Sequence, residues 1–123
     1  MPTGQPSISV ARVYDPPAEV GTRVLVDRIW PRGLRKQEAH LDEWCKDVAP
    51  STELRRWYGH DPERFEEFAR RYRTELRQPA RAAAVKHLRE VAVTRPVILL
   101  TATKSVDISQ AAVLADVLRE PAK

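Results

Sequence analysis

Runs of β-branched and aromatic residues near both ends of the chain predict strands. Residues 8–14 form the first run, which stops at Asp15-Pro16-Pro17 because proline cannot donate to a sheet ladder. Residues 23–29 form the second run, in which alternate side chains face opposite sides. Residues 97–100 are all apolar, as in a strand that is covered on both faces. The pattern therefore predicts three strands.

Helical spacing of apolar residues predicts the segments between and after these strands. Within residues 38–48, four apolar side chains fall at i, i+3, i+4 and i+7, which predicts a helix: Leu41, Trp44, Cys45 and Val48. Cap residues and further apolar stripes predict four more helices: residues 51–59 between Ser51 and Gly59, residues 61–76, residues 80–93, and a last helix that begins at a capping-box pair of Asp107 and Gln110.

The order of these elements predicts an α/β fold, with a small, mostly parallel sheet flanked by helices in a Rossmann-like three-layer arrangement. A chain of 123 residues fits one domain. We expect residues 1–7 to be a loose N-terminal tail and residues 8–123 to be a single α/β domain. The last strand is expected to be central, while the order of the other strands stays open.

The composition is typical of a soluble globular protein, with 42% hydrophobic residues, 31% charged residues and a mean hydropathy of −0.49. No apolar run reaches the ~20 residues of a membrane helix, and the N-terminus lacks the pattern of a signal peptide. The single cysteine, Cys45, cannot form an internal disulfide. We therefore expect a cytoplasmic protein that does not bind membranes; its oligomeric state stays open.

Positive charge is concentrated in one segment. Residues 23–36 contain five basic residues and one acid, which equals the net charge of +4 of the whole chain. This segment covers the second predicted strand and the loop after it. Because ligands of α/β sheets bind at the carboxyl ends of strands, the charge predicts a local anion site rather than a generally basic surface.

The expected anion-binding residues lie at the ends of two strands. Arg28 and Arg32 offer planar guanidinium groups for phosphate or carboxylate, and Lys104 adds a point charge after the last strand. Further candidates are the donors Thr101, Thr103 and Ser105 and the aromatic residues Trp30 and Trp57, which would form pocket walls. The alternatives are that Arg28 forms a structural ion pair and that both tryptophans belong to the core.

His60 and Asp27 are the candidate catalytic residues. His60 precedes Asp61, which would orient it as a general base. The alternative is that Asp61 is a helix cap, His60 a helix exit and Asp27 part of a structural ion pair. Neither the spacing of metal ligands nor a nucleotide-binding loop is found, so we expect no metal and no cofactor.

The chain resembles the DUF488 family, the YeaO-like proteins of bacteria. The resemblance covers residues 8–118 and rests on three motifs in matching order: VDRIWPRGL, LDEWCKDVAPSTELRRWYGHDPERFEEFARRY and LLTATKS. It implies a compact α/β domain of the bacterial cytoplasm. The family has no settled activity, so the resemblance does not supply a reaction.

One loop departs from the family pattern. In the family, the loop after the last strand commonly continues Lys-Asp, with a histidine or asparagine a few residues later. This chain has Lys104-Ser105 and then Ile108-Ser109-Gln110. The resemblance therefore implies an altered or inactive member if those residues carry chemistry in the relatives; if they only shape a turn, Ser105 and Asp107 replace them.

Three functional classes follow. The first is a domain with an arginine-rich cleft for a small anionic ligand that bears phosphate or carboxylate, either as a binding protein or as a small hydrolase or transferase. The second, less favoured, is a nucleic-acid-binding regulator that uses Arg55 and Arg56 of the short helix. The third is a domain that binds a protein partner without catalysis.

Overall fold

A four-stranded parallel sheet organises the protein in a computed structural model that describes residues 7–17 and 20–120. The strands are β1 (Ile8–Arg12), β2 (Thr22–Leu25), β3 (Glu43–Trp44) and β4 (Val97–Thr101), in the spatial order β1-β4-β2-β3. The expected central position of the last strand is confirmed, because β4 pairs in parallel with both β1 and β2.

All five residues of β4 are buried, which explains their continuous apolar run. Val97 and Leu99 point to one face of the sheet and belong to the larger core cluster, while Ile98 and Leu100 point to the other face and belong to a second cluster. Alternate residues of this strand therefore supply two separate cores.

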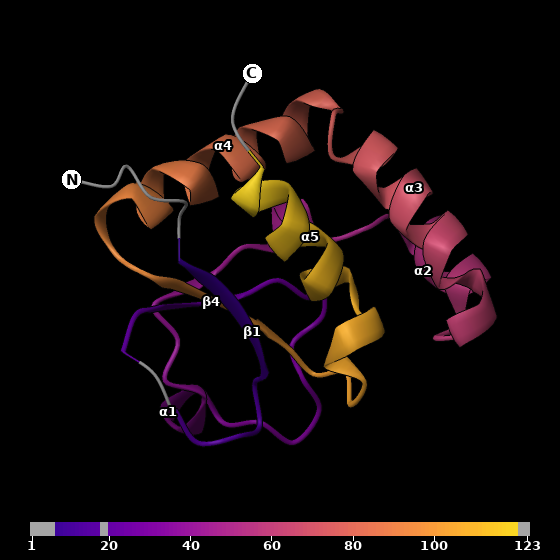
Figure 1. Ribbon diagram of the computed structural model, residues 1–123. Helices are drawn as coiled ribbons and strands as arrows, with labels where there is room; N and C mark the ends of the chain where they lie inside the picture. The colour runs from indigo at the N-terminus through magenta and orange to yellow at the C-terminus, as the bar shows by residue number, and fades with distance from the viewer. Residues whose placement is uncertain (1–6, 18–19, 121–123) are drawn as a thin grey trace.

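Four helices cover one face of the sheet: α2 (Thr52–Tyr58), α3 (Phe65–Glu75), α4 (Pro79–Thr94) and α5 (Gln110–Arg119). In Figure 1 they lie together above β1 and β4, whereas α1 (Lys36–Ala39) lies apart below the strands. The 3₁₀ turns η1 (Lys46–Val48), η2 (Pro62–Arg64) and η3 (Val106–Ile108) join these elements. The predicted α/β class, a single compact domain with a parallel sheet flanked by helices, is confirmed.

The second face of the sheet is covered mainly by the connection from β2 to β3. Trp30 and Trp44 meet edge to face there, with their ring centroids 5.2 Å apart. Each indole donates to a backbone carbonyl, Trp30 to Leu34 at 2.7 Å and Trp44 to Asp27 at 2.7 Å. Loop residues and the single turn of α1 thus form the layer on this side.

The helix predicted over residues 38–48 is wrong. The structure has α1, strand β3 and the turn η1 in this region instead. Trp44 packs in the second cluster and the adjacent Cys45 in the first, because β3 sends neighbouring side chains to opposite faces of the sheet. Because both faces of the sheet are buried here, apolar residues point to both sides. Their spacing along the chain therefore resembles that of the apolar side of a helix.

The cap residues predicted most of the other helix ends. Ser51 accepts a hydrogen bond from the Leu54 amide at the start of α2, and Gly59 ends that helix with a φ of 54°. Asp61 caps η2 ahead of α3. The predicted start of the last helix at Asp107 is wrong: Asp107 lies within η3, and Ser109 caps α5 by accepting from the Ala112 amide.

The predicted N-terminal tail lies outside the described residues except for Ser7, whose carbonyl accepts a hydrogen bond from Val97 at 2.9 Å. Within the described ranges, none of the helices combines the length and the apolar character needed to cross a bilayer.

Tyr72 on α3 is fully buried, and its hydroxyl donates to the carbonyl of Val48 at 2.5 Å. Burial raises the pKa of this phenol well above 10, because the phenolate would lose its hydration. The hydrogen bond fixes the turn before α2 against α3.

We expect the free energy of unfolding to fall as the pH rises above 10, because the unfolded state loses the Tyr72 proton while the folded state keeps it. Tyr72→Phe should reduce this slope by up to about 1.4 kcal/mol per pH unit. Urea denaturation at a series of pH values between 9 and 12 measures the slope. Equal slopes in the two proteins would contradict burial of a neutral phenol.

Candidate functional site

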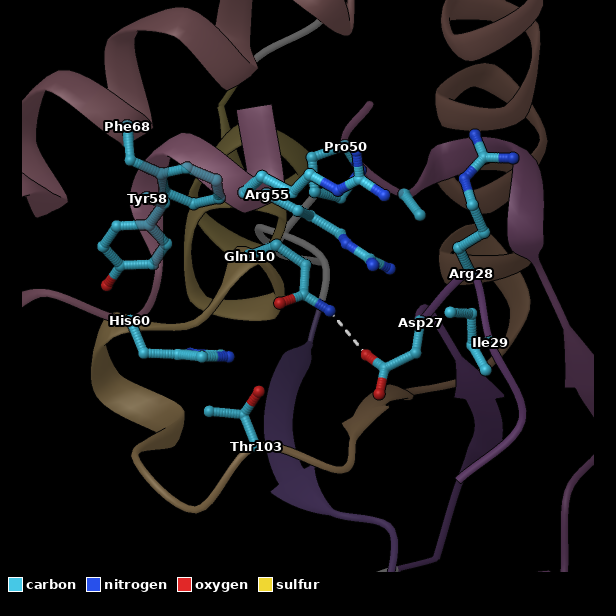
Figure 2. A pocket seen from close by; sticks show the side chains of 12 residues that line it. Asp27, Arg28, Ile29, Pro50, Arg55, Tyr58, His60, Phe68, Thr103 and Gln110 are labelled. Atoms are coloured by element: carbon cyan, nitrogen blue, oxygen red, sulfur yellow. Dashed lines mark hydrogen bonds between the residues drawn. The ribbon is translucent and has the colours of Figure 1, made fainter. Parts of the chain in front are cut away.

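A pocket of about 270 Å³ opens at the carboxyl ends of β2 and β4. It lies between the segment after β2, helix α2 with the residues that follow it, and the start of α5. Figure 2 shows its side chains converging from these elements. The lining residues are Asp27, Arg28, Ile29, Ala49, Pro50, Arg55, Arg56, Tyr58, His60, Phe68, Thr103 and Gln110.

The carboxylate of Asp27 ties three elements together at the floor of this pocket. It accepts hydrogen bonds from the Thr101 hydroxyl at 2.8 Å, from the Ala102 amide at 2.8 Å and from the Gln110 side chain at 2.5 Å. The segment after β2, the end of β4 and the first residue of α5 are thereby joined. Asp27 is therefore a positioning residue for the pocket as well as a candidate for chemistry.

Asp27 reaches this position because β2 ends at Leu25. Val24 and Val26 face the helices, and regular alternation would turn Asp27 to the opposite face. Once the strand has ended, its side chain instead meets Thr101, which lies on the helix-covered face together with Leu99. The predicted extension of this strand to residue 29 is wrong, because regular strand structure ends at Leu25.

Three arginines form the polar walls. Arg28 follows β2, while Arg55 and Arg56 are adjacent on α2, and Figure 2 shows that Arg28 and Arg55 come from different elements. None of the three guanidinium groups forms an ion pair or a hydrogen bond with another residue in the part of the chain that the structure describes. The pocket thus gathers three cations around one carboxylate that already accepts three hydrogen bonds.

His60 lines the pocket in an unusual backbone conformation. Gly59 and His60 are both left-handed, with φ values of 54° and 57°, and this region is unfavourable for a residue with a Cβ. The Tyr58 hydroxyl donates to the Ile108 carbonyl at 2.6 Å, and its ring lies 5.9 Å from the imidazole of His60. His60 is exposed, and its imidazole lies at the edge of the pocket beside this ring.

Four of the residues expected from sequence come together here: Asp27, Arg28, His60 and Thr103 line the pocket. Thr101 lies directly beneath them and is fully buried. The sequence points to Arg55 and Arg56 only as contacts for nucleic acid, and to Gln110 only as part of a helix cap. No local pattern marks Gln110, because its partners are 9 and 83 residues away.

The other expected residues lie elsewhere. Arg32, Lys104 and Ser105 are exposed and outside the pocket lining. Trp30 packs on the opposite face of the sheet. Trp57 packs against the helical core, and the guanidinium groups of Arg64 and Arg71 lie 5.3 Å and 4.3 Å from its ring centroid. The predicted clamp of Arg28, Arg32 and Lys104 is therefore not assembled, and neither tryptophan is a pocket wall.

The basic residues of the positively charged segment, residues 23–36, lie in different parts of the structure. Arg23 is buried and donates to the His40 carbonyl at 3.0 Å and the Ala39 carbonyl at 3.3 Å, at the C-terminal end of α1. Burial lowers the pKa of this guanidinium, and the nearby Asp42 opposes that effect. Of the basic residues in this segment, Arg28 alone lines the pocket.

Cys45 is buried in the larger core cluster and is not among the residues that line the pocket. Burial, reinforced by the carboxylates of Glu43 and Asp47, raises the pKa of its thiol to about 11. A thiol with such a pKa is a poor nucleophile at neutral pH. Cys45 is therefore an inert core residue.

The fold and the pocket define a small α/β domain with a polar pocket at the carboxyl ends of its parallel strands. Comparison with known sequences gives its family. Residues 7–123 match DUF488-N3i, described as the inactive DUF488-N3 subclade. The chain belongs to the DUF488 family.

Two relatives show how far the similarity extends. Uncharacterized protein Rv3073c of Mycobacterium tuberculosis is 54% identical over 112 residues, which are 90% of this chain and 92% of the relative. Uncharacterized protein YeaO of Escherichia coli is 41% identical over 114 residues, 92% of this chain and 97% of the relative. No solved structure matches the chain.

Proposed function

We propose that this protein is a non-catalytic binding domain that holds a small anion, bearing phosphate or carboxylate, in the pocket at the carboxyl ends of β2 and β4. The observation that carries the proposal is that three arginines without an ion-pair partner in the described chain line one pocket: Arg28, Arg55 and Arg56. Planar guanidinium groups bind such anions through paired, charge-assisted hydrogen bonds.

The protein's other arginines provide the comparison. Arg70 and Arg71 pair with Glu67, Arg73 with Glu120, and Arg119 with Asp116. Arg64 also pairs with Asp61, while other exposed arginines such as Arg77 and Arg95 have no carboxylate partner in the described chain. The pocket arginines differ from these in lining one cavity together. A bound anion would supply the missing negative charge.

Two observations favour binding without catalysis. Both oxygens of the Asp27 carboxylate already accept hydrogen bonds from Thr101, Ala102 and Gln110, which fits a role in holding the pocket together. The matching subclade is described as inactive, and we extend that description to this chain. His60 is the pocket residue best suited to proton transfer, so a turnover that is lost in His60→Asn would contradict this part of the proposal.

Arg55→Ala is expected to weaken phosphate and sulfate binding roughly tenfold or more, because a charge-assisted hydrogen bond contributes about 1.5–3 kcal/mol. Arg55→Lys should have an intermediate effect, since it keeps the charge and loses the two-point geometry. Isothermal titration calorimetry at low chloride concentration measures both affinities.

Arg77→Ala is the matched control for Arg55→Ala, because Arg77 is exposed beyond the end of α3 and outside the pocket lining. It removes the same charge from the protein and should leave the affinity within about twofold. If the two alanine variants weaken binding equally, the anion is attracted by overall charge and the pocket is not the site.

Nucleic acid is the alternative for the same arginines. A helix of seven residues offers little length for reading a groove, and its arginines line a pocket. We expect no sequence-dependent retardation of DNA in a gel at low salt. Retardation that is abolished by Arg55→Ala and falls steeply with salt would favour the nucleic-acid alternative.

A further inference from the structure

The floor and the walls of the pocket offer different hydrogen-bonding groups to a ligand. The walls carry the donors of Arg28, Arg55 and Arg56. The floor is formed by Asp27 and Gln110, which are joined by the hydrogen bond drawn in Figure 2. A ligand must satisfy both surfaces.

The orientation of the Gln110 amide follows from its partners. An ionised carboxylate only accepts, so the amide nitrogen must face Asp27, and it lies 3.5 Å from the Thr101 hydroxyl oxygen as well. The amide oxygen is therefore directed away from Asp27, and Figure 2 shows it on the side of His60. No residue in the described chain donates to this oxygen, so it offers a free acceptor to the pocket.

The donor that meets this acceptor is a neutral group. An ammonium group would also suit an amide oxygen, but the lining of the pocket already carries three guanidinium groups against the single carboxylate of Asp27, and a further positive charge adds to this excess. A hydroxyl group donates without adding charge. Hence the wall takes the anionic end of a ligand and the floor takes a hydroxyl group.

The volume of the pocket leaves room for more than an anionic group alone. About 270 Å³ corresponds to the liquid volume of roughly nine water molecules. This space exceeds what a bare phosphate ion needs. A chain of a few hydroxylated carbons attached to one anionic group fits this space.

We infer that the pocket selects small hydroxylated anions, such as the phosphate ester of a short polyol or a hydroxy acid, with Gln110 as the residue that determines specificity. The inference rests on the proposed function, because it assigns the anionic end of the ligand to the arginine walls. It adds the requirement for a hydroxyl group at the floor.

A matched pair of ligands tests this inference on the unaltered protein. Glycerol 3-phosphate and n-propyl phosphate have the same number of carbons and the same anionic group, and they differ in their hydroxyl groups. By calorimetry, glycerol 3-phosphate should bind roughly tenfold more tightly, the contribution of about one net hydrogen bond. Gln110→Met should bring the two affinities within about twofold of each other, while Gln37→Met, on exposed α1, should keep the preference.

The outcomes separate the two proposals. Equal binding of both phosphates by the unaltered protein would overturn the hydroxyl selectivity and leave the anion pocket intact. This measurement does not depend on the folding of any variant. A preference that persists in Gln110→Met would overturn the role of Gln110. If neither phosphate binds, both the proposed function and this inference fail.

Discussion

Asp27→Ala is expected to lower the free energy of unfolding by about 3 kcal/mol. The substitution leaves the Thr101 hydroxyl, the Ala102 amide and the Gln110 amide without their acceptor, and each partly buried donor costs about 1–3 kcal/mol when unsatisfied. Because Asp27 is half-buried, water replaces part of the loss. Urea denaturation followed by circular dichroism measures the change.

Two further variants test the cause of this loss. Asp27→Asn keeps one acceptor oxygen and should cost about 1–2 kcal/mol. Asp116→Ala removes a carboxylate whose ion pair with Arg119 is exposed, so it should change stability by less than about 0.5 kcal/mol. If Asp27→Ala were as mild as Asp116→Ala, the three-way connection at the pocket floor would not hold the strands and α5 together.

Phe68→Ala is expected to destabilise the protein by about 4 kcal/mol, within the usual range for truncating a buried phenylalanine. Phe68 is 1% exposed and stacks on Tyr58 with ring centroids 4.2 Å apart and on Tyr72 at 5.7 Å. The same side chain forms the apolar back of the pocket. The chemical denaturation midpoint measures the loss of stability.

Phe65→Ala is the control for Phe68→Ala, because Phe65 is on the same helix and only partly buried against the same core. It should cost about half as much or less, since less apolar area returns to water. Phe68→Leu should recover much of the stability, because it refills most of the cavity. Equal losses for Phe65→Ala and Phe68→Ala would show that the stack beside the pocket contributes little.

The sequence predicted those parts of the fold that depend on neighbouring residues and that have only one structural interpretation. The apolar run of β4 and the caps at Ser51, Gly59 and Asp61 act through neighbouring residues, and these predictions are confirmed. The helix prediction for residues 38–48 was wrong because burial on both faces of the sheet removes the apolar–polar alternation that marks a strand. Asp107 and Ser109 both precede α5, and only the path of the chain through η3 decides which of them caps it.

The candidate site was predicted only in part, for a geometric reason. Asp27, Arg28 and Thr103 were found because parallel strands end at the same edge of a sheet. Arg55 and Gln110 reach that edge from helices whose packing is not encoded in local spacing. Trp30 was assigned to the cleft because its neighbours are charged, but the turn after β2 carries it to the opposite face.

A crystal structure of the protein soaked in phosphate or sulfate tests the anion pocket most directly. The proposal predicts a tetrahedral ion within hydrogen-bonding distance of Arg55 or Arg56 and of Arg28, above the Asp27–Gln110 floor. The ion should be absent or displaced in crystals of Arg55→Ala. A pocket that holds only water at saturating phosphate, with ions ordered elsewhere on the surface, would contradict it.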